Sequence, residues 1–440
     1  MKKSYLKKIY FLSLFFFVFA LVSCQSAETS SVSRDDDLSS PPPSAGPSPE
    51  SGGVLSLVTS PHGLIFTSLA SAPDGFYEVT SHSDWTANIF YTDYQTKQKV
   101  YLSSQLSSSH RDETDESFIP TTVGGVFPAC DGKYLYVFKI GNSELERVYG
   151  EDGRACIWRA SLNGAGRLKM ELPANMSLLD GSGIVSDQHV LYAVVSVTDE
   201  AQESYRLVQI DIKRQTVQTL EELSAEQNHF LLGVAEDSLV MKSITRVPSA
   251  RSQKELLKKL SEREHAVYLY NPRTGARTPL KSWKQGQAAE LLGPDSLYFY
   301  TSDNRLEKAN VKDGTLVGVG KVTFPGDFAG KDVTPEIQIF DHHIIFRTVS
   351  DQEQKRYAYD LITGELKQLS LQFNDAPLSI LIETDGFFVV HTGDQEFSYA
   401  DTAPDGAPIA NTQLVPIYSL IQKEDYWNNR PNYTFISSPE

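Results

Sequence analysis

One short motif, repeated seven times, most constrains how this chain can fold. Each copy is an Asp-led turn followed at once by an apolar strand. The copies read DGFYEV from Asp74, DGKYLYVF from Asp131, DQHVLYAV from Asp187, DSLVMKS from Asp237, DSLYFY from Asp295, DHHIIF from Asp341 and DGFFVV from Asp385. Successive copies start 44 to 58 residues apart. Repeats of that length are typical of folds in which similar units pack side by side.

The segments around each Asp turn predict four antiparallel strands. A short apolar run precedes the turn, as in EIQIF (336–340), and a polar loop follows the second strand. Two alternating strands then flank a tight turn, as in NIFYTDYQTKQKVYL (88–102) and RYAYDLITGELKQLSL (356–371). Alternation around such turns is the hairpin signal. Each unit therefore contains two hairpins.

Four-stranded units without helices between them predict an all-β fold, a β-propeller with four-stranded antiparallel blades. Seven repeats predict seven blades, because one unit alone cannot bury both of its faces and the ring must close. Six or eight blades stay open as alternatives, since the strand VLSLVTS (54–60) has no place in the repeat. We expect the propeller domain to take residues 54–440, including a C-terminal tail.

Residues 1–24 have the pattern of an export signal. A basic head with Lys2, Lys3, Lys7 and Lys8 precedes an apolar run over 9–22, which suits a signal-peptide core better than a spanning helix. The run ends in Leu21-Val22-Ser23-Cys24, which resembles the bacterial lipoprotein signal. That resemblance implies that Cys24 is lipidated and anchors the exported chain to the outer leaflet of the bacterial cytoplasmic membrane.

Residues 25–53 are dominated by Ser, Pro, Gly and acids, and this composition predicts a disordered tether. The first 24 residues hold four Lys and no acid, so the rest of the chain carries 36 − 56 = −20 charges. This charge excludes nucleic-acid backbone binding, which needs a basic footprint. We expect a monomer whose only membrane contact is its N-terminal lipid.

Several short segments resemble known propeller families. Ser71-Ala72-Pro73-Asp74-Gly75 and YDLITGEL (359–366) are similar to the repeats of TolB-type, WD40-like propellers. The stretch 101–118 and the tail from Ile421 to Tyr433 resemble clostridial-type propeller lipoproteins, whose activity is mostly undefined. Those lipoproteins hold spaced Cys and a His in the stretch matching 101–118. Here His110 is kept and Ser stands at the Cys positions, so the resemblance supports no metal or disulfide there.

Three insertions are expected on one face of the propeller. The pattern SQKELLKKLSER (252–263) predicts an amphipathic helix with Ser252 as its N-cap and Glu255 completing a capping box. The loops 139–155 and 195–204 open on the same face. Loops on a rigid scaffold often carry function, so this face is the candidate binding surface, although such loops also simply tolerate insertion.

Four aromatic residues are candidates for a stacking surface that binds sugars or peptides. They are Trp85, Trp283, Tyr426 and Trp427. The alternative interpretation is that these rings seal gaps between blades.

No catalytic or metal-binding pattern emerges from the sequence. The repeated Asp residues are read as turn caps. Strand alternation predicts that His342 and His343 face opposite sides and cannot share an ion. Cys130 and Cys156 are expected to be free thiols. The innermost strands offer only Glu336 and Glu383 as weak catalytic candidates, so we expect no metal and no cofactor.

These observations favour a non-enzymatic binding or scaffold module for a protein or glycan. The alternative is a cell-surface propeller hydrolase or lyase that acts on polysaccharide or peptide. The two differ in their carboxylates, because a glycosidase needs two that converge within about 5–10 Å in a central pocket.

Overall fold

The computed structural model describes residues 53–59, 69–105, 108–179, 181–199, 202–293, 296–325, 333–348, 355–402 and 408–436. The predicted signal peptide with Cys24, and residues 25–52 of the predicted tether, lie outside the described residues. Residues 52–246 and 261–440 form one compact unit, and residues 247–260 belong to another. Among the described helices, none has the length and apolar character needed to cross a membrane.

Seven groups of four consecutive strands, each called a sheet below, account for most of the described residues. Neighbouring strands within a group pair antiparallel, and one parallel pairing between Leu292 and Gln338 joins the fifth group to the sixth. The first three are β2 (Leu69–Ala72), β3 (Gly75–Ser81), β4 (Ala87–Asp93), β5 (Lys99–Tyr101); β7 (Val126–Cys130), β8 (Tyr134–Lys139), β9 (Cys156–Ser161), β10 (Leu168–Glu171); and β12 (Ile184–Ser186), β13 (Leu191–Asp199), β14 (Gln202–Asp211), β15 (Thr216–Leu223). The fourth and fifth are β16 (Gln227–Ala235), β17 (Ser238–Thr245), β18 (Glu264–Tyr270), β19 (Arg277–Lys284); and β20 (Ala288–Gly293), β21 (Ser296–Thr301), β22 (Arg305–Ala309), β23 (Leu316–Lys321). The last two are β24 (Val333–Phe340), β25 (His343–Thr348), β26 (Arg356–Asp360), β27 (Leu366–Leu369); and β30 (Ile380–Glu383), β31 (Phe387–Thr402), β32 (Pro408–Gln422), β33 (Tyr433–Phe435).

The outer hairpins form where the alternating sequences predict them. In the sixth sheet β26 and β27 pair from Arg356 with Leu369 to Tyr359 with Leu366. The turn between them is closed by Asp360, whose Oδ1 accepts the N–H of Ile362 at 2.7 Å. This is the turn chemistry for which Asp is favoured.

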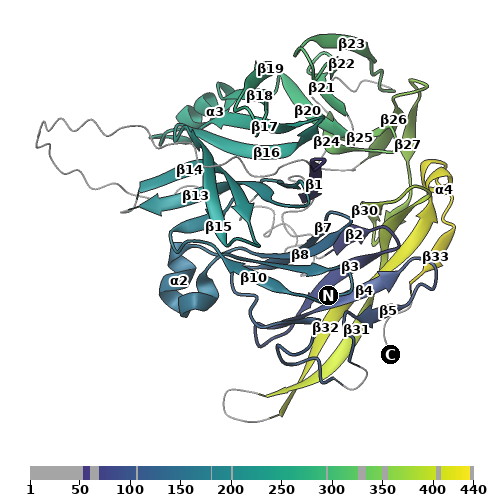
Figure 1. Cartoon of the computed structure of the whole chain (residues 1–440). Helices are drawn as coiled ribbons and strands as arrows, with labels where there is room; N and C mark the ends of the chain where they lie inside the picture. The colour runs from purple at the N-terminus through teal and green to yellow at the C-terminus, as the bar shows by residue number, and fades with distance from the viewer. Residues whose placement is uncertain are drawn as a thin grey trace, which may run out of the picture. The chain divides into compact units, whose positions relative to one another are not determined.

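Hydrophobic packing joins these sheets into a ring. Seven clusters of buried side chains in the described ranges each connect two successive sheets. The last of them closes the circle, because Val389 and Leu420 of the seventh sheet pack with Leu69 and Phe76 of the first. The compact unit is therefore a β-propeller (Figure 1). The prediction of an all-β propeller with four-stranded antiparallel blades is confirmed; the number seven stays a prediction, with which these clusters agree.

The N-terminal strand, which had no predicted place, lies at the inner edge of the third sheet. β1 (Ser56–Thr59) pairs antiparallel with β12, the innermost strand of that sheet. Thr59 Oγ1 accepts the N–H of Ile184 at 2.8 Å, and Val58 packs against the cluster between the second and third sheets. β1 therefore adds an extra strand on the side that faces the centre of the ring.

The remaining elements are short additions to the sheets. They are β6 (Phe118–Ile119), α2 (Ser143–Tyr149), the 3-10 turn η1 (Gly150–Gly153), β11 (Met176–Leu178), α3 (Gln253–Ser261), the pair β28 (Gln372–Phe373) and β29 (Ala376–Pro377), and α4 (Lys423–Trp427). The predicted helix in the fourth sheet's insertion is α3. In this helix the N–H of Glu255 donates to Ser252 Oγ at 3.2 Å. The Glu255 carboxylate accepts from the N–H of Arg251, one residue before the position that a capping box uses.

Candidate functional site

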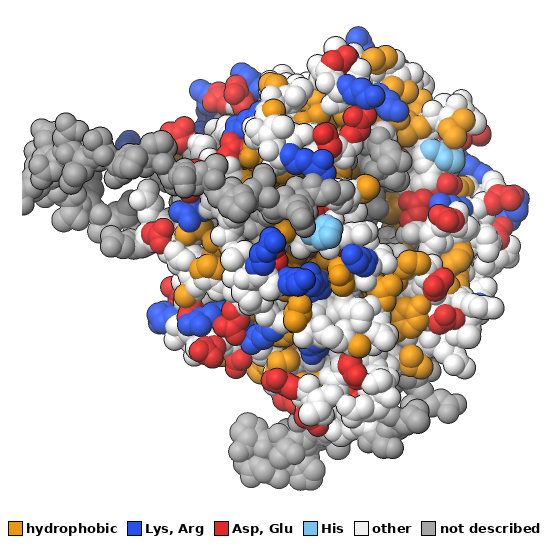
Figure 2. Space-filling model, in the orientation of Figure 1, with side chains coloured by type: hydrophobic (Ala, Val, Ile, Leu, Met, Phe, Trp, Pro, Cys, Tyr) orange, Lys and Arg blue, Asp and Glu red, His pale blue; other side chains and the backbone are white. Residues whose placement is uncertain are grey.

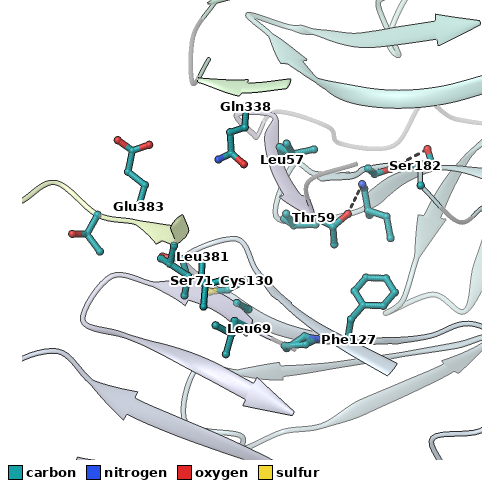
Figure 3. Close-up of a pocket in the computed structure, with 18 of the residues that line it drawn as sticks. Leu57, Thr59, Leu69, Ser71, Phe127, Cys130, Ser182, Gln338, Leu381 and Glu383 are labelled. Atoms are coloured by element: carbon teal, nitrogen blue, oxygen red, sulfur yellow. Dashed lines mark hydrogen bonds between the residues drawn. The ribbon is translucent and has the colours of Figure 1, made fainter. Parts of the chain in front are cut away.

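A cavity of about 750 Å³ lies at the centre of the propeller. Its walls come from innermost strands of five sheets, β2, β7, β12, β24 and β30, together with β1. Cavities of this size suit small ligands or short chain segments. Figure 3 shows Glu383 and Gln338 across the opening from Phe127 and Leu69.

The cavity has an apolar wall and a charged end. The apolar side chains include Leu57, Leu69, Phe127, Leu179 and Leu381. The charged end is formed by residues at the turns of the sixth and seventh sheets and at the start of α4, namely Asp341, His342, Glu383, Asp385 and Lys423. Binding pockets typically combine apolar walls with a few convergent polar groups, and in this cavity the polar lining is at least as extensive as the apolar lining.

The turn between β24 and β25 gives the charged end its shape. Phe340 pairs with His343, so Asp341 and His342 form a two-residue hairpin turn. Both have left-handed backbone angles, with φ of 43° and 58°, as a type I′ turn requires. Because His342 lies in the turn and not in a strand, alternation does not apply to it. The two imidazole centroids are 4.7 Å apart, so the prediction that His342 and His343 face opposite sides is wrong.

Lys423 joins two carboxylates at this end of the cavity. Its Nζ lies 2.8 Å from Glu383 Oε1 and 3.4 Å from Asp341 Oδ1. Glu383 Oε1 also accepts the backbone N–H of Asp341 at 2.8 Å. Burial opposes the charge on Lys423, but the hydrogen bond and attraction to Glu383 outweigh it and raise the pKa of Lys423 above its usual value.

His343 is held between Trp427 and the turn. Its ring stacks on the Trp427 indole with centroids 4.0 Å apart, and Trp427 Nε1 donates to Asp341 Oδ2 at 3.1 Å. His343 Nδ1 lies 2.8 Å from the Asp341 carbonyl oxygen. Burial lowers the pKa of His343 below its usual value, and the hydrogen bond to the carbonyl only partly opposes this.

The four predicted aromatic residues do not form one surface. Trp85 is 58 % exposed, as expected, but Trp283, Tyr426 and Trp427 are only 7 %, 1 % and 8 % exposed. Trp283 packs between the fourth and fifth sheets, and the other two between the sixth and seventh. Their predicted exposure is therefore wrong. The alternative interpretation, rings that seal gaps between blades, describes these three, because their large apolar faces stabilise the packing of neighbouring sheets.

The repeated Asp residues are not equivalent. Asp131 and Asp187 each accept the N–H groups two and three residues ahead, at 2.8 to 3.0 Å, as predicted for turn caps. Asp341 has moved into the turn itself and accepts side-chain donors instead. The turn of the sixth sheet is thus shifted by one residue relative to that of the second, and the Asp341 carboxylate is left to contact side chains. The pairing of Phe340 with His343 marks this shift.

Of the two acidic candidates, only Glu383 lies at the cavity. Glu336 forms ion pairs with Arg356 at 3.0 Å and Arg347 at 3.4 Å and does not line the described cavity. Sequence reasoning missed Lys423, which follows the long strand β32, because nothing near it in the sequence indicates a carboxylate partner.

The stretch 101–118 forms a hydrogen-bonded loop. Asp115 is buried, and its carboxylate accepts from Ser103, Ser117 and the ring of His110, the last at 2.9 Å. Burial alone would raise the pKa of Asp115, but hydrogen bonds from the hydroxyl groups of Ser108, Ser117 and Ser103 hold it well below its usual range. The Ser residues here therefore bind a carboxylate and order the loop.

The propeller face that Figure 2 shows carries acidic and basic side chains interspersed with hydrophobic ones. Interspersed charges favour solubility and do not single out a charged partner for this face. The cavity is therefore the better-defined candidate.

No protein-family model and no curated relative matches this sequence. Solved structures with a similar chain path include the β-propeller domain of the Trilobed protease from Pyrococcus furiosus, with a TM-score of 0.45 and 11 % identity over 88 % of this chain and 97 % of that one. An acylaminoacyl peptidase from Pyrococcus horikoshii has a TM-score of 0.43 and 11 % identity over 83 % of this chain. This chain spans only 57 % of that peptidase. TolB from Acinetobacter baumannii has a TM-score of 0.31 and 11 % identity over 79 % of this chain and 76 % of that one. Such distant similarity carries no argument about function.

Proposed function

We propose that this protein is an exported, lipid-anchored β-propeller that binds an extended segment of a partner protein in its central cavity. Lipidated Cys24 holds it at the outer leaflet of the bacterial cytoplasmic membrane, and residues 25–53 act as the tether. The protein works as a binding or scaffold module, and catalysis is not part of this role.

The observation that carries the proposal is the pairing of β1 with β12. Strand β1 is an extended segment that adds to the inner edge of a sheet through backbone hydrogen bonds and apolar side chains. Addition of a strand to a free edge is a general mode of peptide recognition. The innermost strands β2, β7 and β30 also end their sheets and line the cavity, whereas β24 is already paired with β20, so a second extended segment can add to one of these three edges in the same way.

The lining favours a peptide over a glycan. Among the described lining residues Phe127 is the only Phe, Tyr or Trp, whereas carbohydrate sites usually offer aromatic faces for stacking. The aliphatic wall suits Leu, Ile or Val side chains of a peptide, and Lys423, Asp341 and Asp385 offer polar contacts at one end.

Peptide binding can be tested by selecting displayed random peptides on the full chain in detergent and measuring affinity by fluorescence anisotropy. Gln338→Trp adds bulk to the cavity lining, and we expect it to weaken binding at least tenfold. Val148→Trp is the matched control, because Val148 is 60 % exposed on α2, and we expect no change. If only Val148→Trp lost binding, the peptide would bind at the loop face and not in the cavity. If the chain bound cell-wall glycans selectively, the ligand would be a glycan.

The anchor is tested separately. We expect Cys24→Ser to release the protein from the membrane fraction, because the exported chain has no other predicted anchor than the lipid on Cys24. Continued membrane fractionation of that variant would contradict the lipoprotein assignment.

One observation favours the hydrolase or lyase alternative. Asp341 and Glu383 both contact Lys423 Nζ, so two carboxylates converge in a central pocket, as a glycosidase requires. If the chain cleaves a polysaccharide or peptide and Glu383→Gln abolishes turnover while the protein stays folded, the enzymatic alternative replaces the binding role.

A further inference from the structure

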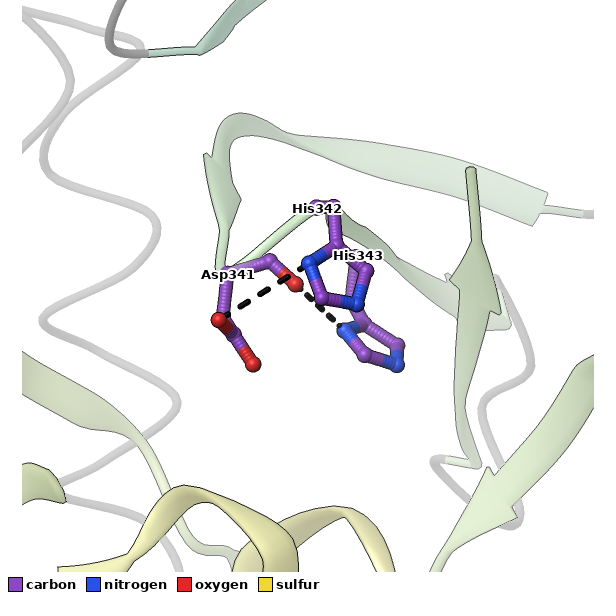
Figure 4. A group of neighbouring side chains, drawn as sticks. All are labelled: Asp341, His342 and His343. Carbon is purple, nitrogen blue, oxygen red and sulfur yellow. Dashed lines mark hydrogen bonds and ion pairs between the residues drawn. The ribbon is translucent and has the colours of Figure 1, made fainter. Parts of the chain in front are cut away.

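We propose that Asp341, His342 and His343 bind one divalent transition-metal ion. One carboxylate oxygen of Asp341 and one nitrogen of each imidazole lie within 4.8 Å of one another (Figure 4). Donor atoms that bind one ion at about 2 Å lie about 3–4 Å apart, so small side-chain rotations bring the three together. The site does not depend on whether the cavity binds a peptide.

The hairpin turn is what makes this arrangement available. In a regular strand, consecutive side chains point to opposite faces, and His342 and His343 could not meet. The left-handed backbone of Asp341 and His342 turns both side chains out of that alternation. Asp341 and His342 also line the cavity, so an ion and its water ligands have a route to the site.

The geometry of His342 indicates that its nitrogens are not satisfied by their neighbours. His342 Nδ1 lies 3.8 Å from Asp341 Oδ1, and Nε2 lies 3.9 Å from Asp360 Oδ1. Both distances exceed those of a hydrogen bond. The first is close to the separation of two atoms that bind the same ion, and the second places a carboxylate where it can orient the ring, as carboxylates beside metal-binding His commonly do.

The local charge also suits a divalent cation. Three carboxylates, Asp341, Asp360 and Glu383, and one ammonium, that of Lys423, give 3 × (−1) + 1 = −2 around the turn. Lys423 is closer to Glu383 than to Asp341, so it can keep its shorter contact when an ion binds Asp341.

The donor set selects the kind of ion. Two imidazole nitrogens and one carboxylate suit Zn²⁺, Co²⁺ or Ni²⁺, whereas Ca²⁺ and Mg²⁺ prefer oxygen ligands. With three protein ligands, a water molecule can complete a tetrahedral site.

The experiment is a titration of the full chain, untagged, freed of metal by a chelator and kept in detergent. We expect one Zn²⁺ per chain by calorimetry, and Co²⁺ to give visible absorption that Zn²⁺ displaces. We expect His342→Ala, Asp341→Asn and His343→Gln each to weaken Zn²⁺ binding at least tenfold. His391→Ala is the matched control, because His391 is also paired with an Asp, Asp394, at 2.7 Å, and its binding should equal that of the unmodified chain.

Trp427 gives a second readout, because its ring stacks on His343. We expect Co²⁺ to quench tryptophan fluorescence in the unmodified chain, and Trp427→Phe to lose most of this quenching while still binding Co²⁺. His342, which is partly exposed, can be changed without disturbing the packed Trp427. The proposal is overturned if the unmodified chain binds no Zn²⁺ at micromolar concentration, or if a folded His342→Ala binds Zn²⁺ as tightly.

Discussion

Asp131 and Ser186 tie two neighbouring blades together. Ser186, in the innermost strand of the third sheet, donates its hydroxyl to Asp131 Oδ2 of the second sheet at 2.7 Å. The same oxygen accepts from Tyr136 at 2.8 Å, and Oδ1 caps the turn. One residue of the repeated motif therefore closes its own turn and fixes the register between two sheets.

Replacing Asp131 should destabilise the propeller strongly. Asp131→Ala removes the carboxylate acceptor of the buried Tyr136 and Ser186 hydroxyls and leaves them only a long contact with each other, at 3.5 Å. We expect the free energy of unfolding to fall by about 2–4 kcal/mol, the cost of unsatisfied buried donors, in urea denaturation.

The matched control is Asp237→Ala. Asp237 occupies the same place in the repeat but is exposed, and its carboxylate contacts only Asn271 and Ser238 among the described residues. We expect it to cost less than about 1 kcal/mol. Equal losses for the two variants would show that the bond between blades adds nothing.

Two truncations at the N-terminus should affect the stability of the propeller differently. Removing residues 26–52 should leave the thermal midpoint unchanged, because the Ser-, Pro- and acid-rich composition of this predicted tether offers little apolar surface to pack on the propeller. Removing 26–59 also removes Leu55 and Val58, which pack against two clusters, and we expect a loss of about 1–3 kcal/mol. If both truncations melt alike, β1 does not contribute to stability.

The helix α3 should be dispensable for folding. None of its residues is buried, and it lies in sequence between two strands that already pair directly, β17 and β18. We expect replacement of 250–261 by a short Gly-Ser linker to change the free energy of unfolding by less than about 1 kcal/mol. A chain that no longer folds cooperatively would show that this insertion belongs to the core.

Much of the fold could be predicted because its signals are local. Alternation, turn residues and the repeat length are all read within a few residues, and they identified the strands and the sheets that they form. The place of β1 could not be read locally, because its partner β12 is 125 or more residues away. Long-range pairing of one extra strand leaves no mark in a repeat pattern.

The candidate site was predicted less well for the same reason. Exposure of Trp283 and Trp427 depends on which sheets pack against them, and composition does not reveal that. The prediction for His342 was wrong because the turn of the sixth sheet is shifted by one residue. Asp341 lies within its turn, whereas Asp131 of the second sheet precedes its turn. Glu383 was recognised as an acid on an inner strand, but its partner Lys423 is 40 residues further along the chain, directly after β32.

The two described cysteines should resist alkylation in the folded protein. Burial raises the pKa of Cys156 to about 12 and also raises that of Cys130 above its usual value, so neither is a thiolate at pH 8. We expect iodoacetamide to label neither residue in the native state and both in urea, measured by peptide mass. Rapid native labelling of Cys156 would contradict its burial between the first and second sheets.

Stability should fall as the pH decreases below neutrality. Burial is the main reason that the pKa values of His229, His265 and His343 lie below the usual value in the folded protein. In the unfolded chain these groups take up a proton near pH 6.5, so below that pH the unfolded state binds more protons. The stability present above pH 6.5 is therefore lost as the pH falls through 6.5 towards the lower folded values, by at most about 1.4 kcal/mol per pH unit for each group.

The contribution of one of these residues can be isolated with His265→Gln, compared with His189→Gln as an exposed control. Urea denaturation midpoints at pH 7.5, 6.5 and 5.5 should fall with pH in the unmodified chain and in His189→Gln. They should fall less steeply in His265→Gln, even if that variant is less stable at pH 7.5. The same slope in all three chains would show that His265 takes up its proton equally in the folded and unfolded states, because only a difference in bound protons makes stability depend on pH.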